Sequence, residues 1–170
     1  MIARILSLAL ATLTVSSAAH AGSLFETGLT YQWQQSDIRN PAPYGESTAK
    51  MEGFGLLFRW AYRWNDQVFT GLDLHYHFPR YKDASVSYNT STSNFDLGPT
   101  LGYVTPWHGV HVWGTYIALA EIDPVGNQNL NYRFLNASGW RLGLGVPFYM
   151  TNLSLQYQFT DFRKTRFENS

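Results

Sequence analysis

Two histidines and an aspartate alternate in the short stretch Asp73-Leu74-His75-Tyr76-His77. On a β-strand, residues two apart share a face and lie about 7 Å from each other, so Asp73, His75 and His77 would point the same way. A His-x-His pair on a strand can supply two ligands to a zinc ion, and a histidine beside a carboxylate can act as a general base. Either chemistry needs one more group, a third metal ligand or a nucleophilic serine, and no local motif supplies it.

We therefore interpret these histidines as buried, hydrogen-bonded side chains and not as ligands or catalytic groups. The sequence contains none of the patterns G-x-S-x-G, H-E-x-x-H and C-x-x-C, and no phosphate-binding loop. No catalytic residue, metal or other cofactor is expected.

A period of two residues extends far beyond this stretch and predicts β-strands. Between residues 53 and 64, large apolar side chains occupy one side, while glycine, alanine, Arg59 and Arg63 occupy the other. With that stretch, seven strands are expected, the others over residues 25–34, 68–78, 95–103, 110–120, 139–146 and 153–159. In residues 110–120 the phase is ambiguous, and we expect Trp113, Ile117 and Leu119 on the outward, apolar side.

The two faces of these strands differ in a way that favours a membrane barrel. One face carries bulky apolar and aromatic side chains, and the other carries Gly, Ser, Thr, Gln and single charges. A soluble sandwich or barrel would keep its bulk inside and present abundant Lys and Glu to water. Brief turns at Asn65, Pro106 and Pro147 alternate with longer polar segments. We predict an all-β, antiparallel up-and-down transmembrane β-barrel, with apolar residues facing lipid and small or polar residues filling the lumen.

The aromatic residues are distributed as this arrangement requires. A tilted strand from Phe54 to Trp64 spans roughly 25 Å along the membrane normal, the height of the apolar band in an outer-membrane barrel. Aromatic rings gather towards both ends of the strands, where the two lipid–water interfaces would lie. The residues expected at these interfaces include Trp33, Trp60, Tyr62, Trp64, Tyr76, Tyr103, Trp107 and Trp140.

The inward charges should pair with one another. An eight-stranded barrel is just wide enough for its own side chains to fill it, and an isolated charge in such a lumen is costly. A turn centred on Asp66 would place Arg59 opposite Asp73, and Glu26 could approach Arg63. The candidate lumen residues are Glu26, Arg59, Arg63, Asp73, His75, His77, Asp96 and Arg141.

The first residues have the features of a secretory signal peptide. A short positive region precedes an apolar run over residues 5–15, and Ala19-His20-Ala21 is a small-x-small cleavage pattern. We predict a signal peptide over residues 1–21 and a barrel domain over residues 22–170. Removal of Arg4 leaves eleven Lys and Arg against 12 Asp and Glu, a balance that does not suggest nucleic acid as a partner. The chain has no cysteine, so disulfides do not stabilise it.

With this pattern, the chain resembles the small bacterial outer-membrane β-barrel proteins of the eight-stranded type. The resemblance covers residues 22–163 and rests on alternating strands, aromatic girdles and the succession of short and long connections. It implies a Gram-negative outer membrane, short turns in the periplasm, long loops outside, and two partners, membrane lipid and the outer-membrane insertion machinery. These barrels close with an even number of strands, whereas seven are visible. We expect the C-terminal strand to be missing; the alternatives are a strand supplied by residues 84–90 and an irregular closure.

Three functions are compatible with the sequence. The first, which we favour, is a non-enzymatic outer-membrane protein with a structural, surface-recognition or minor small-solute role. The second is a lipid-modifying or metal-dependent enzyme of the same architecture that uses the lumen histidines. The third is a soluble secreted barrel that binds an apolar ligand.

Overall fold

The fold is one antiparallel β-sheet that closes on itself. The computed structural model describes residues 2–16, 22–39, 46–83, 88–106, 109–124, 132–148 and 151–167. The strands are β1 (Ile2–Ser16), β2 (Gly22–Arg39), β3 (Glu46–Arg63), β4 (Val68–Asp83), β5 (Tyr88–Val104), β6 (His111–Ile117), β7 (Leu119–Pro124), β8 (Tyr132–Phe148) and β9 (Thr151–Phe167). Within these ranges, no helix is long and apolar enough to cross a membrane.

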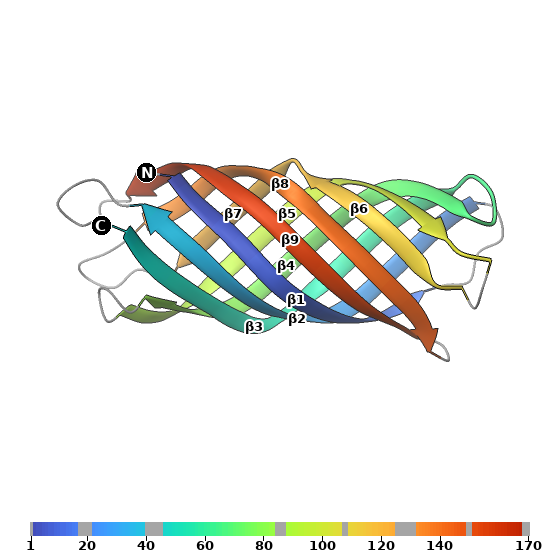
Figure 1. Cartoon of the computed structure of the whole chain (residues 1–170), viewed down its shortest axis with the longest axis horizontal. Coiled ribbons are helices and arrows are strands. Elements are labelled where there is room, and N and C mark those ends of the chain that lie inside the picture. The colour runs from blue at the N-terminus through green and yellow to red at the C-terminus, as the bar shows by residue number, and fades with distance from the viewer. Residues whose placement is uncertain are drawn as a thin grey trace.

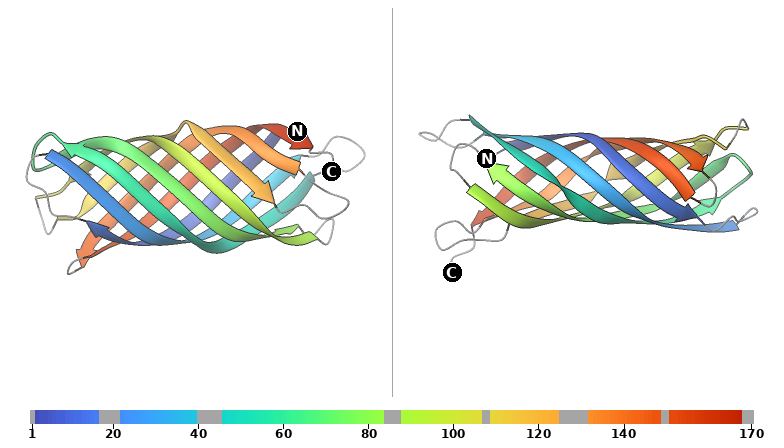
Figure 2. Two further views of the ribbon diagram at one scale, coloured as in Figure 1. Left: turned by 180° about the vertical axis from the view of Figure 1, so that it is seen from behind. Right: turned by 90° about the horizontal axis from the view of Figure 1, so that it is seen from below.

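Strand pairing runs once round the whole sheet. The order is β4-β3-β2-β1-β9-β8-β6-β5-β7, with additional pairing of β4 with β5 and of β8 with β7. β6 and β7 share the neighbours β5 and β8 and are separated only by Ala118, so they are two halves of one barrel strand. The result is a barrel of eight strongly tilted strands (Figures 1 and 2). The predicted all-β up-and-down architecture is confirmed.

The eighth strand comes from the start of the chain. β1 lies between β2 and β9 and pairs with both. It is formed by residues that the sequence analysis assigned to the signal peptide, and it occupies the position of the strand that we expected to be missing. Of the alternative strand over residues 84–90, residues 88–90 belong to β5, and residues 84–87 lie outside the described residues. The signal peptide stays a prediction: completing the barrel and being cleaved off are alternative uses of the same segment.

The two ends of the barrel are defined by the strand ends that meet there. We call the end at which β3 passes into β4 through residues 64–67 the turn end, and the end at which Arg39 lies opposite Glu46 and Asp83 opposite Tyr88 the loop end. The polar segments expected to be long loops are partly strand. β2 and β3 pair as far as Arg39 with Glu46, and β4 and β5 as far as Asp83 with Tyr88. The hairpins therefore continue beyond the apolar part of the barrel.

The turn between β3 and β4 sets their register. Asn65 Oδ1 accepts hydrogen bonds from the backbone N–H groups of Gln67 at 2.9 Å and Val68 at 2.7 Å, an arrangement typical of asparagine in turns. The pairing that follows places Arg59 opposite Asp73, as predicted. This register matters because a shift of one residue would turn every side chain of the strand to the other face.

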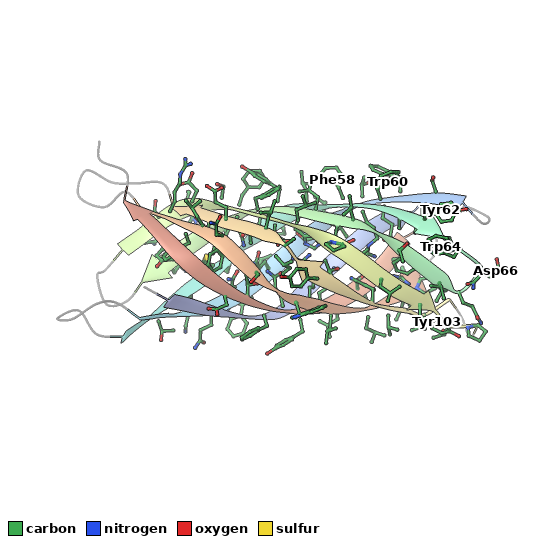
Figure 3. All side chains as sticks on the ribbon, turned by 90° about the horizontal axis from the view of Figure 1, so that it is seen from above. Phe58, Trp60, Tyr62, Trp64, Asp66 and Tyr103 are labelled. Carbon is green, nitrogen blue, oxygen red and sulfur yellow. The ribbon has the colours of Figure 1, made fainter. Side chains whose placement is uncertain are left out.

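The bulky apolar side chains point away from the barrel axis. Trp60, Leu72, Leu142 and Tyr157, from four different strands, are 40% to 61% exposed and share no interior. Figure 3 shows Phe58, Trp60 and Tyr62, in the turn-end half of β3, on the outside of the barrel. The orientation predicted for the two faces of the strands is thus confirmed for these strands.

One prediction about β6 was wrong. Trp113 and Ile117 were expected to face outward with Leu119, but both are buried in the lumen, and only Leu119 is exposed. The reason is Ala118, which interrupts the strand between β6 and β7, so that two consecutive residues, Ala118 and Leu119, are exposed. The inward phase changes from odd to even residue numbers at this point, and no uniform alternation fits the whole stretch.

Candidate functional site

The charged residues expected in the lumen lie on its inner wall. Arg63 is half-buried beside the turn between β3 and β4, whereas each of the others is at most 4% exposed. The buried ones are Glu26, Arg59, Asp73, His75, His77, Asp96 and Arg141. They form two groups, each centred on one guanidinium.

The first group surrounds Arg59 on β3. Its Nε and Nη2 donate hydrogen bonds to the two carboxylate oxygens of Asp73 on β4 at 2.7 and 2.8 Å, a bidentate pair. Its Nη1 donates to Glu26 Oε2 on β2 at 2.9 Å. The predicted pairing of Arg59 with Asp73 is confirmed. The sequence analysis placed Glu26 near Arg63, and in the structure Glu26 contacts Arg59.

Other strands satisfy the remaining oxygens of this group. Thr115 Oγ1 on β6 donates to Asp73 Oδ2 at 2.9 Å, and Asn152 Nδ2 on β9 donates to Glu26 Oε1 at 3.1 Å. The ring of Trp113 lies 4.5 Å from the guanidinium carbon of Arg59, within cation–π range. These residues, which we call the Arg59 cluster, link β2, β3, β4, β6 and β9 across the lumen.

Inward-facing glycines make room for the large rings of this layer. A Cβ atom added at Gly143 would collide with the indole ring of Trp113, and one at Gly102 would collide with the ring of Phe69. Each ring therefore lies directly on the backbone of a neighbouring strand. This packing explains why the inner face is rich in glycine, a feature that otherwise weakens strands.

The second group surrounds Arg141 on β8. Its Nη2 donates to Asp96 Oδ2 on β5 at 2.6 Å, and its Nε donates to Gln158 Oε1 on β9 at 3.0 Å. Gln158 Nε2 donates in turn to Thr160 Oγ1 at 2.9 Å. Within the described part of the chain, Arg141 Nη1 and Asp96 Oδ1 have no hydrogen-bond partner. We call these four residues the Arg141 cluster.

His75 and His77 lie next to the Arg141 cluster. The register of β4 with β5 places His75 opposite Asp96, and one ligand atom from each of His75, His77 and Asp96 lies within 4.8 Å of the other two. The imidazole centroids are 5.6 Å apart. The hydrogen bonds that we expected for these histidines are not formed: none of their four ring nitrogens has a partner among the described residues.

Apolar side chains fill the lumen on both sides of these polar groups. Towards the turn end, Leu24, Ala61, Phe69 and Trp113 form one buried cluster, against which Val104 packs. Towards the loop end, a larger cluster comprises Met51, Tyr81, Ile117, Ala120, Ile122, Phe134, Ala137 and Phe162. The two charged clusters therefore lie between two apolar clusters along the barrel, although Gln34, opposite Met51, and His111, stacked on Trp113, also face the lumen.

On the outer face of β3 and β4, the apolar surface ends towards the loop end. Phe54 on β3 pairs with Phe78 on β4, and both rings are exposed. The next outward pair is Glu52 with Arg80, and Lys82 lies beyond it. Lys82 Nζ is 2.9 Å from Glu52 Oε1, and this hydrogen bond lowers the pKa of Glu52. The change from aromatic to charged side chains marks the edge of a hydrocarbon-facing band.

A family model described as the outer membrane protein beta-barrel domain matches residues 6–169. The chain belongs to this family. Its place is accordingly the bacterial outer membrane, and the apolar outer face is the surface that such a barrel turns to lipid. The comparisons with curated proteins and with solved structures gave no significant match.

In this outer-membrane barrel, the predicted interface aromatics lie on the outer face as far as they are described. Trp33, Trp60, Tyr62, Trp64, Tyr103 and Trp140 are exposed, and Tyr76 is half-buried. Trp107 lies outside the described residues. Several rings stack edge to face with outward neighbours, such as Tyr62 on Trp64 with centroids 5.2 Å apart.

Sequence reasoning missed how the lumen residues combine. It grouped His75 and His77 with Asp73 on their own strand, whereas Asp73 is bound by Arg59 and the carboxylate beside the histidines is Asp96. It also passed over Thr115, Asn152 and Gln158, which complete the two clusters. The available signal was their inward phase: each is a polar residue on the face opposite bulky apolar neighbours.

Proposed function

We propose that this outer-membrane protein is a closed, non-conducting barrel that anchors its loop end at the cell surface, where recognition takes place. The filled lumen supports the first half of this proposal. Described side chains of β2, β3, β4, β5, β6, β8 and β9 meet in the two charged clusters, and an apolar cluster lies on either side of them along the barrel. A lumen of this kind leaves no continuous polar path for solutes, as expected for the narrowest barrels.

The loop end supports the second half. Beyond the last outward aromatic rings, β3, β4, β7 and β8 carry charged side chains at the surface, among them the half-buried pair Arg133 with Asp123 at 2.7 Å. Charged side chains are costly on the lipid face and accumulate where strands leave the hydrocarbon. These hairpins therefore present charged surface to water, and a rigid barrel beneath them holds this surface in place.

The enzymatic alternative receives less support from the geometry. His75 and His77 are at most 1% exposed and lie between the two apolar layers, so a lipid or soluble substrate has no direct contact with them. The soluble alternative would require a polar exterior, whereas the outer face carries large exposed hydrophobic residues on every described barrel wall.

Conductance measurements test this proposal. Purified protein inserted into a planar lipid bilayer should show no ion channels. A control variant, Phe69→Ala with Trp113→Ala, removes the two largest rings of the turn-end layer and should leak more than the wild type if packing closes the lumen. Stable channels in the wild type would contradict the proposal.

Export by a cleaved leader is a separate proposal. The small-x-small pattern at Ala19-His20-Ala21 supports cleavage before Gly22, and the insertion machinery would then receive a chain that begins at β2. N-terminal sequencing of protein extracted from outer membranes distinguishes this from a barrel that keeps β1. A first residue at Gly22 supports cleavage; a chain that starts at residue 1 or 2 shows that β1 remains in the barrel.

A further inference from the structure

His75, His77 and Asp96 converge at one place in the lumen, and their contacts leave metal-binding atoms free. We propose that these three residues bind a divalent transition-metal ion of the zinc type, which serves as an internal crosslink between β4 and β5. This site is independent of the proposed surface role and requires no substrate to reach the lumen.

The strongest argument is the unpartnered state of the ligands. All four ring nitrogens of the two histidines and Asp96 Oδ1 are buried without a hydrogen-bond partner among the residues that the structure describes. Buried polar atoms are nearly always satisfied, because each unsatisfied one costs free energy of desolvation. Five such atoms from three adjacent residues indicate that something outside the chain satisfies them.

The donor set determines which occupant fits. Two imidazoles and one carboxylate suit Zn²⁺ and neighbouring divalent transition metals, whereas Ca²⁺ and Mg²⁺ prefer oxygen ligands alone. The three ligand atoms already lie within 4.8 Å of one another. Zinc–ligand bonds of about 2.0–2.2 Å require separations somewhat shorter than this, which small side-chain rotations provide. The fourth coordination position would be taken by water.

Neighbouring residues position two of the three ligands. The ring of His77 lies on the backbone of β3 at Gly55, where an added Cβ atom would collide with the imidazole. Arg141 Nη2 binds Asp96 Oδ2 at 2.6 Å and leaves Oδ1 directed elsewhere. A ligand carboxylate held by a second group is typical of metal sites, because the second group orients the ligand.

The charge of the lumen is compatible with a cation. Among the buried residues whose side chains are described, three carboxylates, Glu26, Asp73 and Asp96, face two guanidiniums, Arg59 and Arg141. Without Arg63, which is half-buried beside the turn between β3 and β4, these buried groups have one more negative than positive charge when the histidines are neutral, the form in which they bind metal. An alternative that also supplies positive charge is one protonated histidine, and water could satisfy the ring nitrogens without any ion.

Metal analysis of refolded protein separates these possibilities. Because both apolar layers enclose the site, the protein should be refolded in detergent with Zn²⁺ and then dialysed against metal-free buffer. We expect one zinc per chain in the wild type and in the matched control His111→Asn, which alters a buried lumen histidine at the turn end. We expect none in His75→Asn/His77→Asn, and affinity weakened about 10-fold or more in Asp96→Asn.

A second measurement keeps the test valid if the double variant does not refold. Wild-type protein refolded with Co²⁺ should develop the visible absorption of cobalt in a tetrahedral or five-coordinate site with nitrogen and oxygen ligands. The proposal is overturned if the wild type retains no more zinc than His75→Asn/His77→Asn, or if Co²⁺ keeps its octahedral aqueous spectrum. Either result would assign the ring nitrogens to water or to a proton.

Discussion

The two guanidinium clusters of the lumen are built from the same residue types but differ in completeness. Arg59 uses three nitrogens to bind two carboxylates. Those carboxylates also accept hydrogen bonds from Thr115 and Asn152. Arg141 binds one carboxylate, one of its nitrogens is unpartnered, and unpartnered histidines adjoin it in the described part of the lumen.

This difference separates a structural crosslink from a binding site. A buried ion pair contributes to stability only when every charge and lone pair is satisfied, because desolvation otherwise exceeds the attraction. The charged groups of the Arg59 cluster meet this condition with protein atoms alone, although the indole N–H of Trp113 has no partner among the described residues. The Arg141 cluster with its histidines meets it only if another species is bound. The following experiments compare the two clusters, in descending order of expected effect.

Arg59→Gln should have the largest effect, a loss of about 3–5 kcal/mol in the free energy of unfolding. It leaves two buried carboxylates without a counter-charge. Urea unfolding in detergent micelles, followed by tryptophan fluorescence, measures this loss. The control Arg80→Gln changes an exposed arginine on the outer face and should be close to neutral. A loss for Arg59→Gln no greater than that of the control would contradict the structural role of this cluster.

Exchanging the charges of Arg59 and Asp73 should restore stability only in part. In Arg59→Asp with Asp73→Arg, Glu26 faces a new carboxylate, because it lies 2.9 Å from the guanidinium in the wild type. Adding Glu26→Gln removes this repulsion and should restore more. Heat-modifiability on gels compares Arg59→Asp alone with the double and the triple variant, and equal mobility shifts in the double and triple variants would show that Glu26 does not act on Arg59.

Arg141→Gln should cost less than Arg59→Gln, about 1.5–3 kcal/mol, since it removes a charged hydrogen bond to a single carboxylate. The same urea experiment applies, with EDTA present to exclude bound metal. A loss as large as that of Arg59→Gln would mean that both clusters contribute equally to the free energy of unfolding, which would contradict the proposed difference between them.

Thr115→Val should cost about 0.5–1.5 kcal/mol, because Asp73 and Thr100 both lose a hydrogen bond to the hydroxyl. Thr27→Val on the outward face of β2 is the matched control and should not destabilise the barrel. If both variants changed the free energy of unfolding equally, the buried hydrogen bonds of Thr115 would contribute nothing to stability.

His77→Leu should have the smallest effect in metal-free protein, close to zero or slightly stabilising. Replacing an unsatisfied buried polar group by an apolar one removes a penalty and breaks no hydrogen bond. His77→Leu should therefore not lower the free energy of unfolding, whereas Thr115→Val should. Urea unfolding in the presence of EDTA measures both changes. A loss larger than that of Thr115→Val would show that His77 has an essential partner within the protein.

The sequence predicts the contacts of the first cluster better than those of the second for a physical reason. Arg59 and Asp73 flank a tight turn whose centre is visible at Asn65 and Asp66, so the register across β3 and β4 follows from counting residues. His75 and Asp96 also face each other across a hairpin. Its connection lies within a long polar tract without a clear turn signal, so the register could not be counted and Asp96 was not linked to the histidines.

The sequence predicted which side chains point outward wherever apolar and small or polar residues alternate without interruption along a strand. Trp60, Leu142 and Tyr157 face outward as expected, because their strands keep one phase through the apolar band. Trp113 and Ile117 did not follow the prediction, since a single-residue interruption at Ala118 has no signature in composition. Large apolar side chains also lie inside the lumen, so size alone does not predict that a residue faces lipid. Trp113 is inside because it packs on Arg59 and Gly143.

The pairing of β1 with β9 has a consequence for biogenesis. Ala3 lies opposite Phe162, so residues far apart in the sequence are neighbours in the sheet. Such contacts of very high sequence separation form late, since the intervening chain must be ordered first. In the form that contains β1, the cylinder is therefore completed only after β9 has been synthesised, and until then its hydrophobic exterior requires shielding from water by other molecules.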